Sequence, residues 1–340
     1  MHPALARLRI LVPIAFLVAA TSASAQVLDL TINNTGLAIG DKPRVNGVRI
    51  NFRDRQLEEV NGVNITIWNP YSPATGVVNG LALGIPVTGA KDINGIATGI
   101  LGAGADRSIH GIGIAPLGLG AGGDVRGIMI GGIGVGGGGS MTGLAIGGVG
   151  VGSGGAVRGI QIGGVGVGSG GSLTGLSIGG IGVGSAGAVK GIAIGGIGVG
   201  GGSSFTGIGI GGVGVGAGGD ATGLMIGGVG VGSGGTLKGL AIGGVGVGAP
   251  NVQGVLVSPI AAGGQHVHAI VVAGAYFKVD RDGRFDGGAL SSVNHIKGAQ
   301  HGLTIGLFNY ARELHGAQIG LINISDNEGH RRVLPILSAR

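Results

Sequence analysis

The chain has 340 residues, of which 86 are glycine and none is cysteine, and its formal net charge is +6. The lack of cysteine excludes disulfides and thiolate metal sites. Hydrophobic residues make up 44% of the chain and charged residues only 11%, a profile opposite to that of disordered proteins, so the chain is expected to fold. Its cations form no stripe interleaved with aromatic residues, which argues against a nucleic-acid partner.

Residues 1–25 have the pattern of a secretory signal peptide. Arg7 and Arg9 precede an apolar run from Ile10 to Ala20, and Ala23-Ser24-Ala25 has the spacing of small residues at a cleavage site. The apolar run is about half of the ~20 residues that a membrane-spanning helix needs. We therefore expect export, with the mature chain beginning at Gln26 and residing at the outer membrane or cell surface or in the medium.

A glycine recurs every sixteen residues from Gly95 to Gly239. We number the positions of each unit from this leading glycine. Looser units begin at Gly47, Gly62 and Gly80 on one side and at Gly254, Ala269, Gly288, Gly302 and Gly316 on the other, giving about eighteen units over 47–330. The predicted division is an N-terminal cap region in 26–60, a regular repeat in 47–254, and irregular repeats with a C-terminal cap in 255–340.

Four positions of the eight cleanest units hold aliphatic residues. Position 2 is Ile or Leu and position 7 is Ile or Val, whereas position 3 varies from Met129 to Gln161 and Gly209. From this pattern we expect positions 2, 4, 7 and 9 to be buried and position 3 to be exposed. Position 4 is always Ile (Ile130, Ile146, Ile162, Ile178, Ile194, Ile210, Ile226, Ile242) and position 9 is always Val (Val135, Val151, Val167, Val183, Val199, Val215, Val231, Val247).

The glycine pair between positions 4 and 7, as in Gly131-Gly132, allows the chain to turn a corner there. Each unit then forms one flattened coil of short strands, and stacked coils at about 4.8 Å spacing would share a thin core. The predicted fold is an elongated all-β solenoid of about eighteen coils. Glycine at position 8 would leave an outward stripe of bare backbone, which favours close packing against another surface such as a second copy.

Cations before the leading glycines never occupy adjacent units. Arg126, Arg158, Lys190 and Lys238 are separated by units with threonine at that position. Stacking predicts this interruption, because like charges about 4.8 Å apart repel each other. Duplication of a 32-residue block would give the same pattern.

An outer-membrane up-and-down β-barrel is the alternative fold, because one strand and one turn also take about sixteen residues. Against the barrel, the apolar face switches at the glycine pair, and residues 111–250 contain only one aromatic residue, Phe205. The uniform unit also lacks the alternation of long and short turns that such a barrel has.

Two tandem G-h-x-I-G-h-h-N units, where h is hydrophobic, end at Asn309 and Asn323, and a short apolar segment, Val333–Leu337, follows them. This region of about 40 residues resembles bacterial glycine-rich surface-repeat proteins. The resemblance implies an exported, envelope-associated protein and supplies no catalytic residues.

The clearest candidate ion site is a calcium loop with Asp280, Asp282 and Asp286 as ligands, which makes calcium the one candidate cofactor. A polar hairpin turn is the alternative. His266 and His268 would lie on one side of a strand, where they could serve a metal, although the sequence offers no evident third ligand. We find no catalytic motif and expect no enzymatic activity.

These features together predict an exported structural or adhesive protein of the bacterial envelope. Its partners would be the envelope surface or further copies of itself, with membrane association as a further option. The alternatives are a pore or anchor built on a barrel, and a binding module for ice, glycan or calcium.

Overall fold

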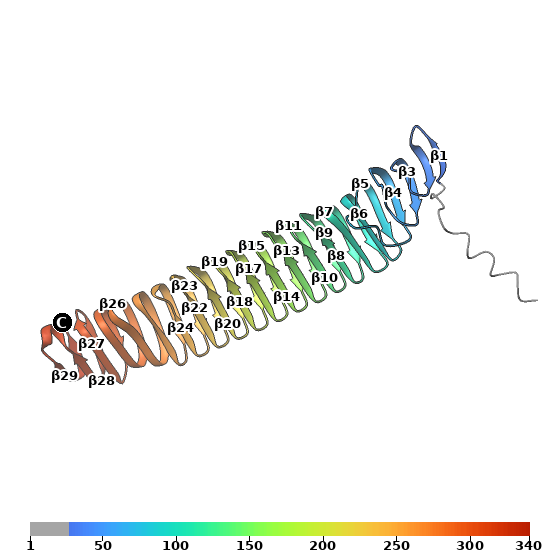
Figure 1. The fold of residues 1–340 in the computed structure, drawn as a ribbon. Helices are drawn as coiled ribbons and strands as arrows, with labels where there is room; N and C mark the ends of the chain where they lie inside the picture. The colour runs from blue at the N-terminus through green and yellow to red at the C-terminus, as the bar shows by residue number, and fades with distance from the viewer. Residues whose placement is uncertain (1–26) are drawn as a thin grey trace, which may run out of the picture.

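A computed structural model describes residues 27–340 as one elongated rod of about eighteen stacked coils (Figure 1). The N-terminal and C-terminal coils lie at opposite ends of the rod. The predicted signal peptide lies outside the described residues.

Successive coils pair in parallel and in register. Strand β9 (Val125–Gly131) pairs with β11 (Met141–Gly147), and Gly127 lies opposite Gly143. The ladder continues through the corner of the coil, where the Val165 N–H donates to the Val149 carbonyl at 2.7 Å. The predicted solenoid is therefore confirmed. The barrel alternative is wrong, because neighbouring strands of an up-and-down barrel are antiparallel.

The central coils form two opposed sheets, which we call the long-strand sheet and the short-strand sheet. The long-strand sheet contains β7 (Gly102–Ala115), β9, β11, β13 (Val157–Gly163), β15 (Leu173–Gly179), β17 (Val189–Gly195), β19 (Phe205–Gly211), β21 (Ala221–Gly227), β23 (Thr236–Gly243) and β25 (Asn251–Ser258). The short-strand sheet contains β8 (Gly118–Ala121), β10 (Gly134–Gly137), β12 (Gly150–Ser153), β14 (Gly166–Ser169), β16 (Gly182–Ser185), β18 (Gly198–Gly201), β20 (Gly214–Ala217), β22 (Gly230–Ser233) and β24 (Gly246–Gly248).

Strands of less regular length form the two ends of the rod. The N-terminal strands are β1 (Leu28–Ile32), β2 (Thr35–Ile39), β3 (Arg44–Asn51), β4 (Glu59–Thr66), β5 (Val77–Gly84) and β6 (Val87–Gly99). The C-terminal elements are β26 (Ala261–Ile305), β27 (Phe308–Leu314), β28 (Ala317–Ser325), the 3₁₀ turn η1 (Asn327–Gly329) and β29 (Arg332–Ala339).

An antiparallel strand closes the ladder at each end. β1 pairs antiparallel with β2, and β29 pairs antiparallel with β28. Without such caps a parallel solenoid would present open strand edges to other chains. Beside the N-terminal cap, the fully buried Arg49 is held by Asp41, Asp54 and Asn64, so the first coils have a charged interior.

The leading glycine is required by the backbone. At Gly175, φ is +117°, and an added Cβ would lie 2.1 Å from the carbonyl oxygen of Gly159 in the preceding coil. A side chain there would collide with backbone that the ladder holds in place. The same geometry corrects one unit boundary, because Gly287, with φ of +142°, has this position, whereas an added Cβ at Gly288 would meet open space.

The prediction of which long-strand residues are buried and which are exposed is wrong. Met129 at position 3 is 1% exposed, whereas Ile128 at position 2 is 42% exposed and Ile133 at position 7 is 52% exposed. The isoleucines of position 4 lie on the outer surface too, where they are half-buried or exposed. The position 9 valines are buried as expected, between 3% and 5% exposed. The long strand alternates as expected, but in the opposite phase.

In several long strands a large inward side chain is paired with a small one. They occupy position 15 of one unit and position 3 of the next, and the pairs include Met141 with Ala145, Leu173 with Ser177, Phe205 with Gly209, and Ala221 with Met225. A Cβ added at Gly209 would lie 3.0 Å from the Phe205 ring. The small pair Val189 and Ala193 lies beside Phe205, the largest side chain of this row. Variation at position 3 is therefore variation in core packing, where the size of one inward residue is adjusted to its neighbours in the same and adjacent coils.

Candidate functional site

The outer surface of the long-strand sheet carries continuous columns of aliphatic side chains. We define the aliphatic face as positions 2 and 4 of eleven consecutive coils, together with position 7 at the adjoining corner. Position 2 contributes Ile112, Ile128, Leu144, Ile160, Leu176, Ile192, Ile208, Leu224, Leu240, Val255 and Ile270; position 4 contributes Ile114, Ile130, Ile146, Ile162, Ile178, Ile194, Ile210, Ile226, Ile242, Val257 and Val272; and position 7 contributes Leu117, Ile133, Val149, Val165, Ile181, Ile197, Val213, Val229, Val245 and Ile260.

The aliphatic face is larger than the apolar patches of ordinary monomeric proteins. Eleven coils at about 4.8 Å extend over roughly 50 Å, and the columns with the corner span roughly 20 Å. The face therefore covers roughly 1,000 Å², compared with about 300–600 Å² for the largest patch on a typical monomer. The aliphatic face is therefore the candidate interaction surface within the described residues.

Cations run along the edge of the aliphatic face that lies away from the corner. Arg126, Arg158, Lys190 and Lys238 lie in one register column with the intervening threonines. Arg126 lies 3.7 Å from Asp124, and within residues 27–340 no carboxylate forms an ion pair with the other three. The face thus combines an aliphatic surface with a positively charged rim.

The outer surface of the short-strand sheet consists of bare backbone. Positions 8 and 10 point outward and are glycine in every coil from Gly118 and Gly120 to Gly246 and Gly248. The fold does not require all of these glycines, since an added Cβ at Gly168 would meet nothing within 4 Å. We call this surface the glycine face.

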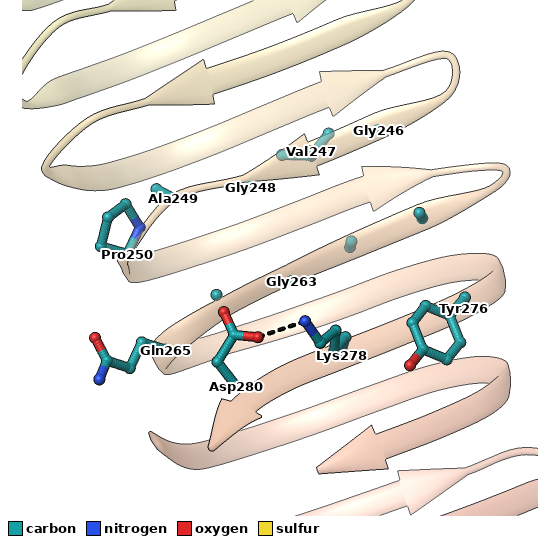
Figure 2. A pocket seen from close by; sticks show the side chains of 13 residues that line it. Gly246, Val247, Gly248, Ala249, Pro250, Gly263, Gln265, Tyr276, Lys278 and Asp280 are labelled. Carbon is teal, nitrogen blue, oxygen red and sulfur yellow. Dashed lines mark ion pairs between the residues drawn. The ribbon is translucent and has the colours of Figure 1, made fainter. Parts of the chain in front are cut away.

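The glycine face ends at a step toward the C-terminus. Gly246 and Gly248 are followed in the next coil by Ala261 and Gly263, and beyond these Tyr276 and Lys278 bound a hollow of about 670 Å³ (Figure 2). Lys278 Nζ lies 2.5 Å from the Asp280 carboxylate, and this partner raises the pKa of the lysine. The hollow is open and has few polar groups directed into it, so it has the form of a step in the surface.

The three aspartates of the candidate calcium loop are directed to different cations. Asp280 pairs with Lys278, Asp282 with Arg312 and Asp286 with Arg284. In the described part of the chain, no group of three or more histidine or acidic side chains is placed to hold a metal.

Histidines of the C-terminal coils stack along the rod. His301 and His315 lie in adjacent coils with ring centroids 4.9 Å apart, and Nδ1 of His301 is 3.8 Å from Asp286. His295 Nδ1 is 2.8 Å from the hydroxyl of Tyr276. His266 and His268 lie opposite Asn251 and Gln253 of the preceding coil.

Two asparagine ladders stabilise the ends of the rod, and neither was predicted from the sequence. In the exposed N-terminal ladder, Asn61 donates to Asn46 at 2.9 Å and Asn79 donates to Asn61 at 2.8 Å. In the C-terminal ladder, all members are fully buried, and Asn294 donates to Asn309 and Asn309 to Asn323, both at 2.7 Å. The signal for both ladders was asparagine at equivalent positions of successive units.

No family model, curated protein or solved structure matched the chain. The chain is a β-solenoid with a repeat of about sixteen residues. The asparagines that carried the resemblance to surface-repeat proteins, Asn309 and Asn323, are the buried ladder residues. Across residues 27–340 no helix is long and apolar enough to cross a membrane.

Proposed function

We propose that the protein is an exported, non-catalytic structural or adhesive rod of the bacterial envelope, held there by contacts along its sides. The observation that carries this proposal is the aliphatic face, which repeats one apolar surface over eleven coils. A contact distributed over identical coils suits a protein that lies along a surface or along another rod, because each coil adds the same small contribution.

The arrangement of the polar groups supports a non-catalytic role. Buried polar side chains serve the ladder: the Ser169 hydroxyl donates to the Gly155 carbonyl at 2.8 Å, and Asn309 bridges its neighbours. The aspartates of the C-terminal coils are paired with cations, as Asp282 is with Arg312. An enzyme instead brings titratable groups together in a pocket with pKa values tuned to the reaction.

Cell fractionation tests this proposal. The full chain is expressed with its own N-terminal segment in a Gram-negative host, and the envelope is washed with carbonate and then with urea. We expect the protein in the envelope fraction or the medium, shortened at its N-terminus, with the envelope-bound part released by the washes. Retention of the uncleaved chain in the cytoplasm would contradict export, and release from the envelope by detergent alone would contradict a peripheral rod.

A further inference from the structure

The outward columns of the long strands are more uniform than the inward ones. Position 3, in the core, ranges from Gly209 to Met225 and Gln161, whereas positions 2 and 4, outside, hold only Ile, Leu or Val over eleven coils. In a single-copy rod the core would impose the stronger limits, because buried volume is fixed while an exposed strand position accepts polar residues such as threonine. The uniformity outside therefore points to a partner that covers this face.

We propose that the partner is a second copy of the chain, bound through the aliphatic face of each copy with the two rods side by side and parallel. This proposal rests on the proposed function, whose structural rod it describes as a pair. Two sheets with aliphatic outer faces would then pack as in a β-sandwich, about 10 Å apart.

The area of the aliphatic face is sufficient for a stable dimer. A standard interface buries about 800 Å² on each partner, and the face offers roughly 1,000 Å² by the coil spacing and strand rise. The interface would have an aliphatic centre, with Arg126, Arg158, Lys190 and Lys238 at its border, the usual arrangement of an apolar core and a polar rim.

The repeat itself favours a second copy over a lipid surface. Each column presents one side chain about every 4.8 Å, and an identical ladder has the same spacing over all eleven coils. A lipid surface is fluid and has no such spacing to match. A symmetric homodimer is also the commonest assembly of soluble chains, and its interface uses the same patch on both copies.

The column of cations at the edge of the aliphatic face favours parallel rods over antiparallel ones. A two-fold axis along the rods places the cation column of one copy opposite the position 4 and corner columns of the other. A two-fold axis across the rods makes them antiparallel and places the two cation columns against each other. The second arrangement brings Arg126 and Arg158 of one copy close to cations of the other without any carboxylate partner for Arg158 in the described residues, and such like charges repel.

The oligomeric state of three purified proteins tests the proposal. Light scattering behind gel filtration, over a hundredfold range of concentration, compares the wild-type chain, the variant I160T/L176T/I192T on the aliphatic face, and the variant G166L/G182L/G198L on the glycine face. We expect a wild-type dimer, at least tenfold weaker association in the threonine variant, and a dimer in the leucine variant. Circular dichroism checks that each variant keeps its strands, and threonine is used because it favours strands.

Cross-linking then tests the orientation. The chain has no cysteine, so Ile128→Cys introduces the only thiol, and a short bismaleimide reagent joins the thiols of two copies when they face each other. Parallel rods bring the two introduced thiols together near one end, whereas antiparallel rods place them far apart. We expect efficient cross-linking of this variant and an equal yield for Leu240→Cys near the other end.

Three results would overturn the proposal. The first is a monomer at all concentrations, whether or not it binds vesicles of phosphatidylcholine and phosphatidylglycerol through the aliphatic face. The second is a dimer that is lost in the leucine variant and kept in the threonine variant, and the third is a dimer that fails to cross-link at both sites. Fractionation is read separately. A dimer that stays in the cytoplasm refutes the proposed function alone, and an exported monomer refutes the paired rod alone.

Discussion

The central coils and the C-terminal coils stack in the same way, but their interiors differ. In the central coils, two inward side chains of each long strand fill a thin apolar space, as Phe205 and Gly209 do in β19. In the C-terminal coils the interior is partly polar, and Asn294, Asn309 and Asn323 are connected by hydrogen bonds along the rod. The central interior is filled mainly by apolar side chains, whereas side-chain hydrogen bonds connect the C-terminal interior along the rod.

This difference also appears at the leading position. The central coils have glycine there without exception. In one C-terminal coil Ala269 takes that position, and its φ is not positive. This one C-terminal coil thus accommodates a Cβ at the leading position, whereas Gly287 and Gly302 of the following coils keep the positive φ of the central coils.

Removing the largest central side chain should have the largest effect. Phe205→Ala leaves a cavity beside Gly209 and should lower the free energy of unfolding by about 3–5 kcal/mol. The variant Phe205→Leu should lose much less, because Leu173 occupies the same position of the repeat in β15 beside a small inward residue, Ser177. Urea unfolding measures both variants. Equal losses in the two would show that side-chain volume at this position does not determine stability.

Adding one methyl group at the leading position should have the next largest effect. Gly175→Ala places a Cβ 2.1 Å from the Gly159 carbonyl oxygen at positive φ and should cost about 2–4 kcal/mol. The control Gly168→Ala places its Cβ in open space and should be neutral or stabilising by up to about 1 kcal/mol. Equal thermal stabilities of these two variants would contradict the distinction between required and unconstrained glycines.

Breaking the buried asparagine ladder should have a smaller effect, confined to the C-terminal coils. Asn309→Ala leaves the Asn323 side-chain oxygen and the Ile319 carbonyl without their donor and should cost about 1–3 kcal/mol. The matched control is Asn79→Ala in the exposed ladder, where water replaces the lost partner and the cost should stay below about 1 kcal/mol. Hydrogen exchange should show faster opening of β27 and β28 in the first variant alone, and equal exchange in both would argue against the buried ladder.

The smallest expected effect is a pH dependence of the C-terminal coils. Burial lowers the pKa of His295, and the nearby Lys297 and Lys278 lower it further. Below the ordinary histidine pKa of about 6.5, the unfolded chain therefore binds a proton more readily than the folded chain does. The free energy of unfolding is unaffected by this group above that pH and falls as the pH drops below it. His295→Gln should lose less thermal stability than the wild type between about pH 7 and about pH 5. The same slope in both proteins would assign the dependence to other groups.

The sixteen-residue period, read together with the apolar pattern inside each unit, was sufficient to favour stacked coils. Aliphatic alternation, interrupted by a glycine pair at a constant place, is compatible with one flattened coil per unit and poorly compatible with an up-and-down barrel. The position 9 valines could also be placed inside from sequence, since glycines occupy both neighbouring positions and leave Val167 and its equivalents as the only apolar side chains of the short strand.

The choice between the two faces of the long strand was decided by the tertiary structure. Both alternating sets can be apolar: in β17, Val189 and Ala193 lie on one side and Ile192 and Ile194 on the other, and hydrophobicity alone favours the isoleucines as core. The interior between the sheets is thin, and it is filled by inward residues of varied size, such as Phe205 beside Gly209 and Ala221 beside Met225. This packing becomes visible only when two positions are known to share one cavity, so the sequence determined the coil and its repeat, and packing decided which residues remained outside.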